Sequence, residues 1–409
     1  MRILTTLLWS ACALVLVGTL RVSTVVAQTR LAALPSEVGV PAGNPTTPER
    51  VALGRLLFWD PILSGQKDVA CATCHHPAFG YSDGLDLSIG THGVGLGTTR
   101  TFAVGAPARL VKRNSQTIVN VAFNGLRAST GDSAVAAKAP MFWDLRVRSL
   151  ESQALEPIKA LEEMRGDAYT EDRALSEVVA RLSANAEYRA MFARAFGGNT
   201  PVSEPNLGRA LAAFQRTIVA TESPFDRYMR GDTTAMTPLQ LRGMERFQSI
   251  GCVNCHSGPM FSDFNAHVLG VPDNQKLPAT DTGVSASHAF RTASLRNLGS
   301  TAPYMHNGAF RTLDDVVNFY QRISGGGGRG GGGRGGPGGP GGRGGGGGRG
   351  VNPLVGRNQI DPLARQLNMR GRGQSDLIAF LRALDDPNFD RTIPDRVPSG
   401  LAVGGRIER

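Results

Sequence analysis

Apolar residues recur at helical spacing in three long stretches of the chain. Residues 171–196 carry leucine, valine, methionine and phenylalanine at this spacing, and residues 206–221 are rich in alanine and leucine. A third stretch, residues 375–384, has the same period, and Ser375 is its predicted N-cap. Glycine, proline, asparagine and threonine are frequent between these stretches, and strand patterns are sparse. The pattern therefore predicts a mostly α fold in which long loops connect the helices.

Two more helices are predicted from matching start sequences in the two halves of the chain. Each start has an N-capping threonine before a proline at the first helical position. Each predicted helix then has a glycine and a phenylalanine four residues apart. The residues are Thr47-Pro48 with Gly54 and Phe58, and Thr237-Pro238 with Gly243 and Phe247. This repetition is typical of two domains that arose by duplication.

Each of these two helices leads into a C-x-x-C-H sequence, at residues 71–75 and 252–256. The spacing lets two thiols on one helical turn add to the vinyl groups of one haem, while the next residue ligates its iron. Two disulfides or a zinc site would use the same cysteines, but neither explains a histidine directly after each pair. We therefore expect two covalently bound haem c groups, one in each of two cytochrome c-like domains. The predicted attachment residues are Cys71, Cys74, Cys252 and Cys255, and the predicted proximal iron ligands are His75 and His256.

The first 27 residues resemble a secretory signal peptide. Arg2 precedes a mostly apolar run that ends near a small-residue cleavage site at residues 25–27. The alternative is an uncleaved membrane anchor, against which Arg21 argues because it interrupts the apolar run. Haem c attachment fits an exported protein, so we expect a periplasmic location. Cleavage would remove two arginines and lower the formal net charge from +10 to +8.

The two haem motifs divide the remaining chain into two predicted domains, residues 36–222 and 223–395. The second contains a glycine- and arginine-rich insert at residues 325–350, with 20 glycines, four arginines and two prolines. Such a composition cannot bury a core, so the insert is predicted to be disordered. Arginine-glycine repeats bind nucleic acid in other settings. In an exported haem protein we favour a flexible insert and expect no nucleic-acid partner.

Several further motifs resemble those of the bacterial di-haem cytochrome c peroxidase family, including its MauG branch. The similarity extends from about residue 48 to residue 385, and the motifs are specific as a set rather than singly. They are Leu56-Leu57-Phe58-Trp59-Asp60-Pro61, Arg113-Asn114-Ser115, Phe142-Trp143-Asp144, Leu150-Glu151-Ser152-Gln153, Leu295-Arg296-Asn297 and Thr301-Ala302-Pro303-Tyr304-Met305-His306-Asn307-Gly308.

The resemblance implies roles for three more residues. Glu151 takes the position of a glutamate that lies over the first haem and transfers a proton during peroxide cleavage. His92, in a glycine-flanked loop, stands where a removable distal ligand of the first iron belongs; otherwise it is a surface histidine. Tyr320 stands where peroxidases place a methionine on the second iron and the MauG branch a tyrosine, and Met305 and Met369 are thioether alternatives. A phenolate would lower the potential relative to methionine, unless Tyr320 only packs.

The family also binds calcium between its domains. The side chain of Asn114 and the backbone carbonyls of Thr301 and Pro303 stand at the matching positions, and oxygen ligands suit calcium. Gln116 replaces a proline that is usual nearby.

Three functions follow from the resemblance. The first is a peroxidase that reduces hydrogen peroxide to water at the His75 haem, with electrons arriving through the His256 haem from a small c-type cytochrome or copper protein. The second is a MauG-like enzyme that oxidises residues of a partner protein, which Tyr320 favours. The third is a non-enzymatic di-haem electron carrier. Many relatives form dimers, so a homodimer is a further expectation.

Overall fold

The computed structural model describes residues 31–127, 132–325, 350–369 and 373–404. The predicted signal peptide and residues 326–349 of the glycine-rich insert lie outside this part of the chain. Within the described residues, no helix has both the length and the apolarity needed to span a bilayer.

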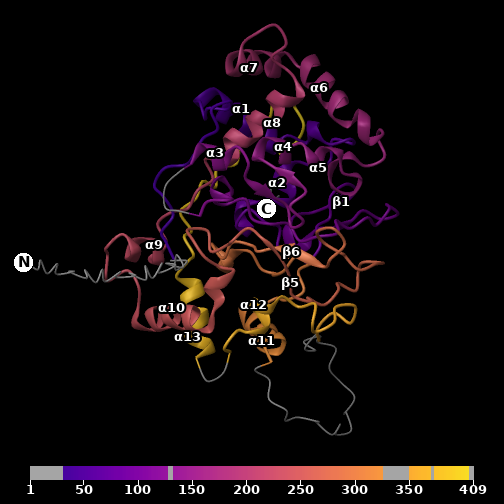
Figure 1. The fold of residues 1–409 in the computed structure, drawn as a ribbon. Helices are drawn as coiled ribbons and strands as arrows, with labels where there is room; N and C mark the ends of the chain where they lie inside the picture. The colour runs from indigo at the N-terminus through magenta and orange to yellow at the C-terminus, as the bar shows by residue number, and fades with distance from the viewer. Residues whose placement is uncertain (1–30, 128–131, 326–349, 370–372, 405–409) are drawn as a thin grey trace, which may run out of the picture.

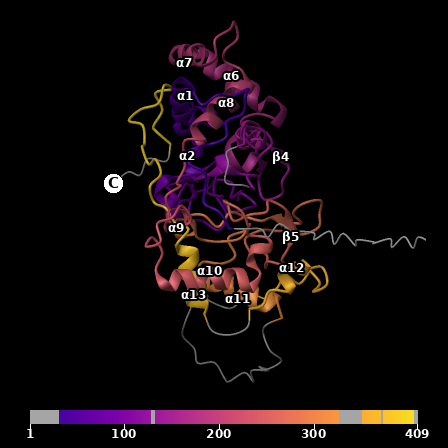
Figure 2. The same ribbon diagram turned by 60° about the vertical axis from the view of Figure 1, so that its left-hand side comes forward.

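Helices dominate the fold, as expected, and they gather into two lobes (Figure 1). The first lobe contains α1 (Pro48–Trp59), α2 (Cys71–Cys74), α3 (Ser133–Ala136), α4 (Leu150–Gln153), α5 (Glu156–Lys159), α6 (Ala174–Ala184), α7 (Ala186–Phe196) and α8 (Glu204–Gln215). The second contains α9 (Pro224–Met229), α10 (Pro238–Ile250), α11 (Leu313–Ile323), α12 (Pro362–Arg365) and α13 (Gln374–Arg382). Figure 2 shows α6 and α7 at one end of the molecule and α10, α11 and α13 at the other.

The described strands form three short antiparallel pairs rather than a sheet that carries the fold. They are β1 (Gly93–Val94) with β2 (Thr101–Phe102), β3 (Pro140–Met141) with β4 (Val147–Arg148), and β5 (Ala266–Val268) with β6 (Ala289–Arg291). The third pair lies between the lobes (Figure 1). Long loops connect most of the elements, as the sequence predicts.

Each lobe is built around one close helix pair. In the first, Gly54 of α1 lets α8 approach so closely that an added Cβ would lie 1.9 Å from the carbonyl oxygen of Ala210. In the second, Gly243 of α10 does the same against α13, where a Cβ would lie 2.0 Å from the carbonyl oxygen of Asp376. The glycines of the predicted repeat are therefore contact points between helices.

The phenylalanines of the repeat also take equivalent places. The Phe58 ring packs 5.2 Å from that of Phe214 on α8, and the Phe247 ring packs 5.3 Å from that of Phe380 on α13. A third aromatic residue, which follows the C-x-x-C-H motif, completes each cluster. These residues are Tyr81, 6.3 Å from Phe58, and Phe261, 6.0 Å from Phe247. The same side-chain cluster thus stands behind both haem motifs.

Three predicted helices differ from the structure in their bounds. Residues 171–196 form two helices, because Asn185 is extended and its side chain caps α7 by accepting from the Tyr188 amide. The helix predicted at 206–221 ends at Gln215, and the chain beyond it pairs instead with Asn120. The last helix begins at Gln374 with Gly373 as N-cap, so Ser375 lies inside it.

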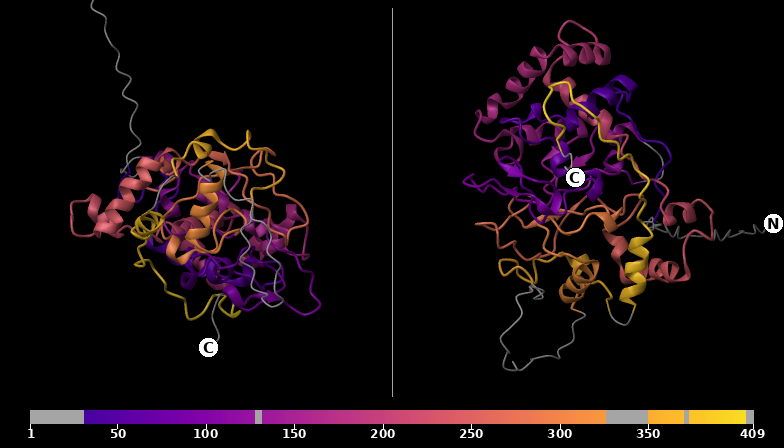
Figure 3. Two further views of the ribbon diagram at one scale, coloured as in Figure 1. Left: turned by 90° about the horizontal axis from the view of Figure 1, so that it is seen from below. Right: turned by 180° about the vertical axis from the view of Figure 1, so that it is seen from behind.

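Both ends of the described chain cross the boundary between the predicted domains. The Leu34 amide, near the N-terminus, donates to Asp226 Oδ1 in the second lobe at 2.8 Å. After α13 the chain runs back along the first lobe (Figure 3), where Asp390 accepts from the Tyr81 hydroxyl and the Gly404 amide donates to Trp59. The predicted second domain ends at residue 395, but residues 389–404 pack on the first lobe.

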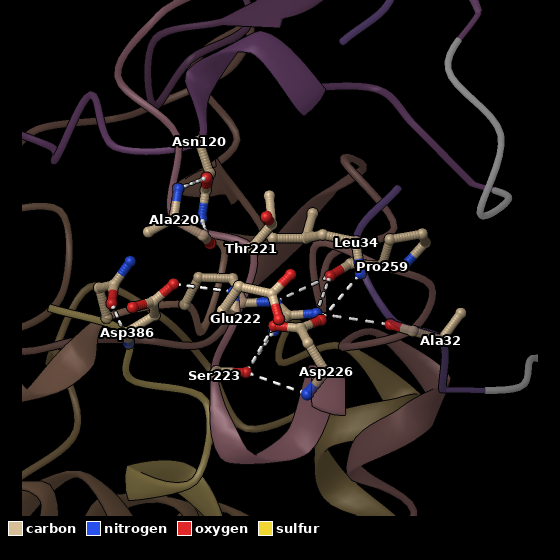
Figure 4. A network of polar contacts seen from close by, with 12 residues as sticks. Ala32, Leu34, Asn120, Ala220, Thr221, Glu222, Ser223, Asp226, Pro259 and Asp386 are labelled. Atoms are coloured by element: carbon tan, nitrogen blue, oxygen red, sulfur yellow. Dashed lines mark hydrogen bonds and ion pairs between the residues drawn. The ribbon is translucent and has the colours of Figure 1, made fainter. Parts of the chain in front are cut away.

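A buried ion pair fixes the loop that follows the second haem motif. Arg296 donates to Asp226 Oδ2 at 2.6 Å, and its Nε and Nη2 atoms donate to the carbonyl oxygen of Pro259. Figure 4 shows Asp226 beside Ser223 at the start of α9, with Ala32 and Pro259 nearby. Because both charged side chains are buried, loss of either one would leave the other uncompensated.

The close helix contact at Gly243 gives a testable prediction. Gly243→Ala places a methyl group on a backbone carbonyl of α13, so we expect a loss of about 1–3 kcal/mol of unfolding free energy despite the better helix propensity of alanine. Gly43→Ala is the matched control, because nothing lies within 4 Å of its added Cβ. Chemical denaturation of the two variants measures the difference, and equal stabilities would contradict this account of the contact.

Candidate functional site

One cavity of about 680 Å³ receives side chains from both lobes. Cys71 and Cys74 line it from the first lobe, and Cys252 and Cys255 line it from the second. All four are free thiols, so the disulfide alternative is absent from the described residues. Burial raises the pKa of the thiols of Cys71 and Cys252 to about 12, which keeps them protonated at neutral pH. Apolar residues make up most of the wall, as in cofactor pockets generally.

The two predicted iron ligands have matching geometry. His75 Nδ1 lies 3.1 Å from the carbonyl oxygen of Tyr81, and His256 Nδ1 lies 2.9 Å from that of Phe261. A carbonyl only accepts, so Nδ1 carries the proton and Nε2 keeps its lone pair. Burial lowers the pKa of both imidazoles, which therefore stay neutral. Two cysteine pairs, each with a neutral imidazole at the cavity wall, fit two haem c groups.

A cluster of ionisable groups stands beside the second motif. His267 lies between two carboxylates, with Nε2 2.9 Å from Asp263 Oδ2 and Nδ1 2.7 Å from Asp361 Oδ2. Hydrogen bonds that His267 donates, first to Asp263 and then to Cys255 and Asp361, raise the pKa of its imidazole to about 11. The ring is therefore charged and has both nitrogens engaged. Cys255, Asp263 and His267 lie close enough to hold a metal ion, but Cys255 is a predicted haem attachment residue and both ring nitrogens of His267 already contact carboxylates.

A second carboxylate, not Glu151, faces the cavity in the first lobe. Glu163 lies in a π-helical turn, residues Leu161–Arg165, and lines the cavity with Gln153 and Glu162. Burial, together with the negative charge of Glu162, raises the pKa of Glu163 to about 7. Its charge also raises the pKa values of the Cys71 and Cys74 thiols, which places it near the first motif. Sequence analysis missed Glu163, because adjacent glutamates usually form a solvated turn.

The surroundings of Glu151 favour a structural role over the catalytic role that the resemblance implies. Its carboxylate oxygen Oε1 lies 2.7 Å from Arg216 Nη2 and 2.9 Å from Asn44 Nδ2. Arg216 follows α8 and is buried, so Glu151 neutralises a charge in the helix packing of the lobe. Glu151 is not among the residues that line the cavity. Glu151 and Gln153 both lie on α4, but the Glu151 side chain pairs with Arg216 whereas Gln153 lines the cavity.

His92 also lies outside the cavity lining. Its backbone has a φ of +65°, and its amide donates to Asp68 Oδ2 at 2.9 Å. Its ring nitrogen Nε2 is buried and has no hydrogen-bond partner among the described residues. The adjoining Gly90 packs against the backbone of Glu162 and Glu163, so the His92 loop borders the wall that carries Glu163. Its role as a distal ligand stays a prediction.

Tyr320, Met305 and Met369 all line the cavity. Tyr320 projects from α11, and burial raises the pKa of its hydroxyl, with further contributions from Cys255 and Cys252. This influence places Tyr320 beside the second motif, where the sequence predicts an iron ligand. The raised pKa means that only a strong partner, such as a ferric iron, would hold it as a phenolate.

The predicted calcium residues also line the cavity. Asn114 Nδ2 donates to the carbonyl oxygen of Leu85, and the Asn114 amide donates to the carbonyl oxygen of His306, three residues beyond Pro303. The Asn114 segment and the Thr301–Pro303 segment therefore meet at the junction of the lobes. The side-chain oxygen of Asn114 accepts no hydrogen bond from the described residues, which suits a cation ligand.

Trp143 occupies the junction between the lobes, although its sequence context indicates only a structural role. Its indole nitrogen donates to the carbonyl oxygen of Asn114 at 3.0 Å, and its ring meets His306 edge-on at 6.5 Å. His306 stacks on Phe290 at 3.6 Å, and burial lowers the pKa of its imidazole to about 3. Trp143, His306 and Phe290 all line the cavity, so neutral rings are continuous across the junction.

Two C-x-x-C-H sites that share one cavity in a mostly helical chain define a di-haem protein of the cytochrome c type. The sequence profile described as "Di-haem cytochrome c peroxidase" matches residues 48–234. MauG of Methylorubrum extorquens, a methylamine utilization protein, is 37% identical over 297 residues, which cover 71% of this chain and 73% of that protein. Cytochrome-c peroxidase IdrP1 of Pseudomonas sp. (strain SCT) is 36% identical over 333 residues, covering 73% of this chain and 78% of the relative.

Solved structures agree with these relatives. The crystal structure of a MauG-like protein associated with microbial copper homeostasis superimposes with a TM-score of 0.64 and 27% sequence identity. The match covers 86% of this chain and 95% of that one. The chain therefore belongs to the di-haem cytochrome c peroxidase family, which includes MauG, and is a peroxidase-type oxidoreductase. Membership of this family implies two haem c groups.

The placement of Glu151 gives a second prediction. Glu151→Gln leaves the buried Arg216 without its carboxylate, so we expect a loss of about 1–3 kcal/mol of unfolding free energy with both haems still attached. Glu177→Gln, which breaks an exposed ion pair with Arg173 on α6, is the matched control and should change stability by about 0.5 kcal/mol or less. Thermal unfolding of both holoproteins gives the comparison; an equal effect would count against a buried structural role for Glu151.

Proposed function

We propose that this protein reduces hydrogen peroxide to water at the haem held by His75. The observation that carries the proposal is Glu163, a carboxyl group with a pKa near 7 in the cavity wall close to Cys71 and Cys74. A general acid–base works best when its pKa lies near the working pH. Gln153, on the same wall, offers a neutral donor and acceptor beside it.

The reaction consumes one peroxide, two electrons and two protons and yields two water molecules. The first haem, when bound, supplies the redox chemistry that cleaves the oxygen–oxygen bond. The Glu163 carboxylate accepts a proton from one peroxide oxygen and returns it to the other oxygen, which leaves as water. The leaving water thus carries both hydrogens of the peroxide, and the remaining oxygen becomes the second water by taking up the two electrons and, from solvent, two protons. A single residue can serve both steps because its pKa lets it hold or release a proton near neutral pH.

The finer assignments belong to the same proposal. Electrons enter at the His256 haem from a small c-type cytochrome or copper protein and cross the junction near Trp143. Calcium binds at Asn114, Thr301 and Pro303 and stiffens the contact between the lobes. The proposal also includes export to the periplasm through the N-terminal signal and formation of a homodimer. It includes an origin of the two lobes by duplication, which the repeated glycine and aromatic contacts support.

A third prediction tests the proton-transfer role of Glu163. Glu163→Gln removes the base but keeps the side-chain shape, so we expect at least about a 100-fold loss of peroxide turnover with a reduced cytochrome c donor. Turnover of the unaltered protein should fall as the pH drops below about 7, because protonation of Glu163 then removes the base. This acidic limb should be absent from the residual activity of the variant.

Glu151→Gln is the matched control for that experiment and should turn over peroxide normally. Loss of turnover in Glu151→Gln alone would return the catalytic role to Glu151 and contradict the assignment to Glu163. Failure of the unaltered protein to bind cyanide or peroxide at either haem would instead favour the electron carrier.

Tyr320 supports a second candidate function, the oxidation of residues in a partner protein. An oxygen ligand from Tyr320 would lower the potential of the second haem, which makes it a poor acceptor from a cytochrome donor but a better store of oxidising equivalents. Its position on the cavity wall beside Cys252 and Cys255 is compatible with such ligation. In both functions, Glu163 would transfer the proton during cleavage of peroxide at the first haem.

A fourth prediction separates the two candidates. Tyr320→Met replaces an oxygen donor by a thioether, so the midpoint potential of the second haem should rise if Tyr320 is its ligand. In the MauG-like function the variant should also lose the long-lived oxidised spectrum that follows peroxide addition. Spectroelectrochemical titration measures the potential, and Tyr320→Phe distinguishes loss of a ligand from gain of a thioether. An unchanged potential in both variants would exclude Tyr320 as a ligand.

A further inference from the structure

Four arginines of the described chain are buried, and three of them have an acid nearby. The acids are Glu151 for Arg216, Asp226 for Arg296, and Asp68 and Asp83 for Arg100. The fourth, Arg291 at the end of β6, has none. An isolated buried charge is costly, so proteins normally pair it. Arg291 is therefore the exception to the rule that this chain otherwise follows.

The contacts of Arg291 are all with neutral groups. Its Nε donates to the carbonyl oxygen of Phe142 at 2.9 Å, and its Nη2 donates to Gln116 Oε1 at 3.0 Å. Burial alone lowers the pKa of the guanidinium to about 10, with no compensation from any described charge. Of the residues outside the described part, only Glu408 carries an acidic side chain.

The location of Arg291 indicates which group could provide the missing negative charge. Arg291 and Gln116 both line the cavity that the haems would occupy. The side chain of Gln116 contacts Arg291, and the backbone carbonyl of Gln116 lies at the ring of His75. Ala293 follows Arg291 by two residues, and its backbone carbonyl lies at the ring of His256. Arg291 therefore stands between the segments that hold the two proximal ligands.

We propose that Arg291 and Gln116 form a carboxylate-binding subsite that holds a haem propionate between the two haems. A guanidinium binds a carboxylate through parallel N–H donors, and in a buried site it keeps that carboxylate ionised. The propionate supplies the counter-charge that no described residue provides. The proposal rests on the two haem c groups and not on peroxide turnover, so it stands or falls independently of the peroxidase function.

A fixed positive charge beside a haem favours the ferrous over the ferric state. Removing it should therefore lower the midpoint potential of the haem whose propionate is bound. In Arg291→Gln we expect at least a tenfold fall in the equilibrium constant for one-electron reduction, about 59 mV. Arg291→Lys keeps the positive charge but loses the parallel N–H donors of the guanidinium, so the midpoint potential should fall by a smaller amount. The haem whose spectrum reports the shift is the one that provides the propionate.

The pH dependence supplies a readout that a purely structural role would not give. A propionate paired with Arg291 stays ionised, so its haem should show no propionate-linked step in potential between about pH 5 and pH 8 in the unaltered protein. In Arg291→Gln such a step should appear, because the carboxylate pKa rises once the guanidinium is gone. Arg189→Gln, an exposed arginine on α7, is the control and should leave both potentials unchanged.

Two results would overturn the proposal. One is an Arg291→Gln holoprotein with both haems attached and both potentials equal to those of the unaltered protein. If that variant yields no holoprotein, the midpoint potentials and their pH dependence are measured instead in Arg291→Lys and in the unaltered protein. A propionate-linked step in both haems of the unaltered protein, or equal potentials in Arg291→Lys and the unaltered protein, would then reject the subsite.

Discussion

The hydrogen bond from each proximal histidine to a backbone carbonyl is the constraint on which the rest of the structure depends. It fixes the proton on Nδ1 and leaves the lone pair of Nε2 available for the predicted bond to iron. The two acceptors, Tyr81 and Phe261, have φ values of +55° and +51°, which bulky residues seldom adopt. Both side chains are fully buried in the aromatic clusters behind the haem motifs. Packing of the helix pairs therefore holds the loop in the conformation that aims the imidazole.

The lobes are joined by polar contacts that surround the shared cavity. Arg113 binds Asp281 of the other lobe at 2.6 Å, and the Arg291 amide donates to the carbonyl oxygen of Trp143 at 2.7 Å. These contacts lie along the path between the two haem motifs. The Trp143 and His306 rings meet at this junction, and Arg113 also pairs with Asp144 there.

The two ends of the cavity have different chemistry although the lobes are built alike. The first end offers Glu163, whose pKa near 7 allows a proton to be held or released. The second offers Tyr320 and, beside its motif, the charged ring of His267 between two aspartates. In the proposed function the first end exchanges protons with peroxide and the second sets the potential of the haem where electrons enter. The difference between the two ends lies in their local charged groups rather than in the helix pairs, which are alike.

Local chemistry in the sequence determined the haem motifs, the helix starts at Thr47 and Thr237, the mostly helical class and the family, because attachment spacing and capping act within a few residues. Only the tertiary structure decided which carboxylate faces the cavity. Glu151 on α4 and Glu163 in the π-helical turn after α5 differ in what lies opposite them, which is Arg216 for Glu151 and the cavity for Glu163. That none of the described acidic residues lies near Arg291 is likewise invisible in the sequence, since it depends on every segment that packs around that side chain.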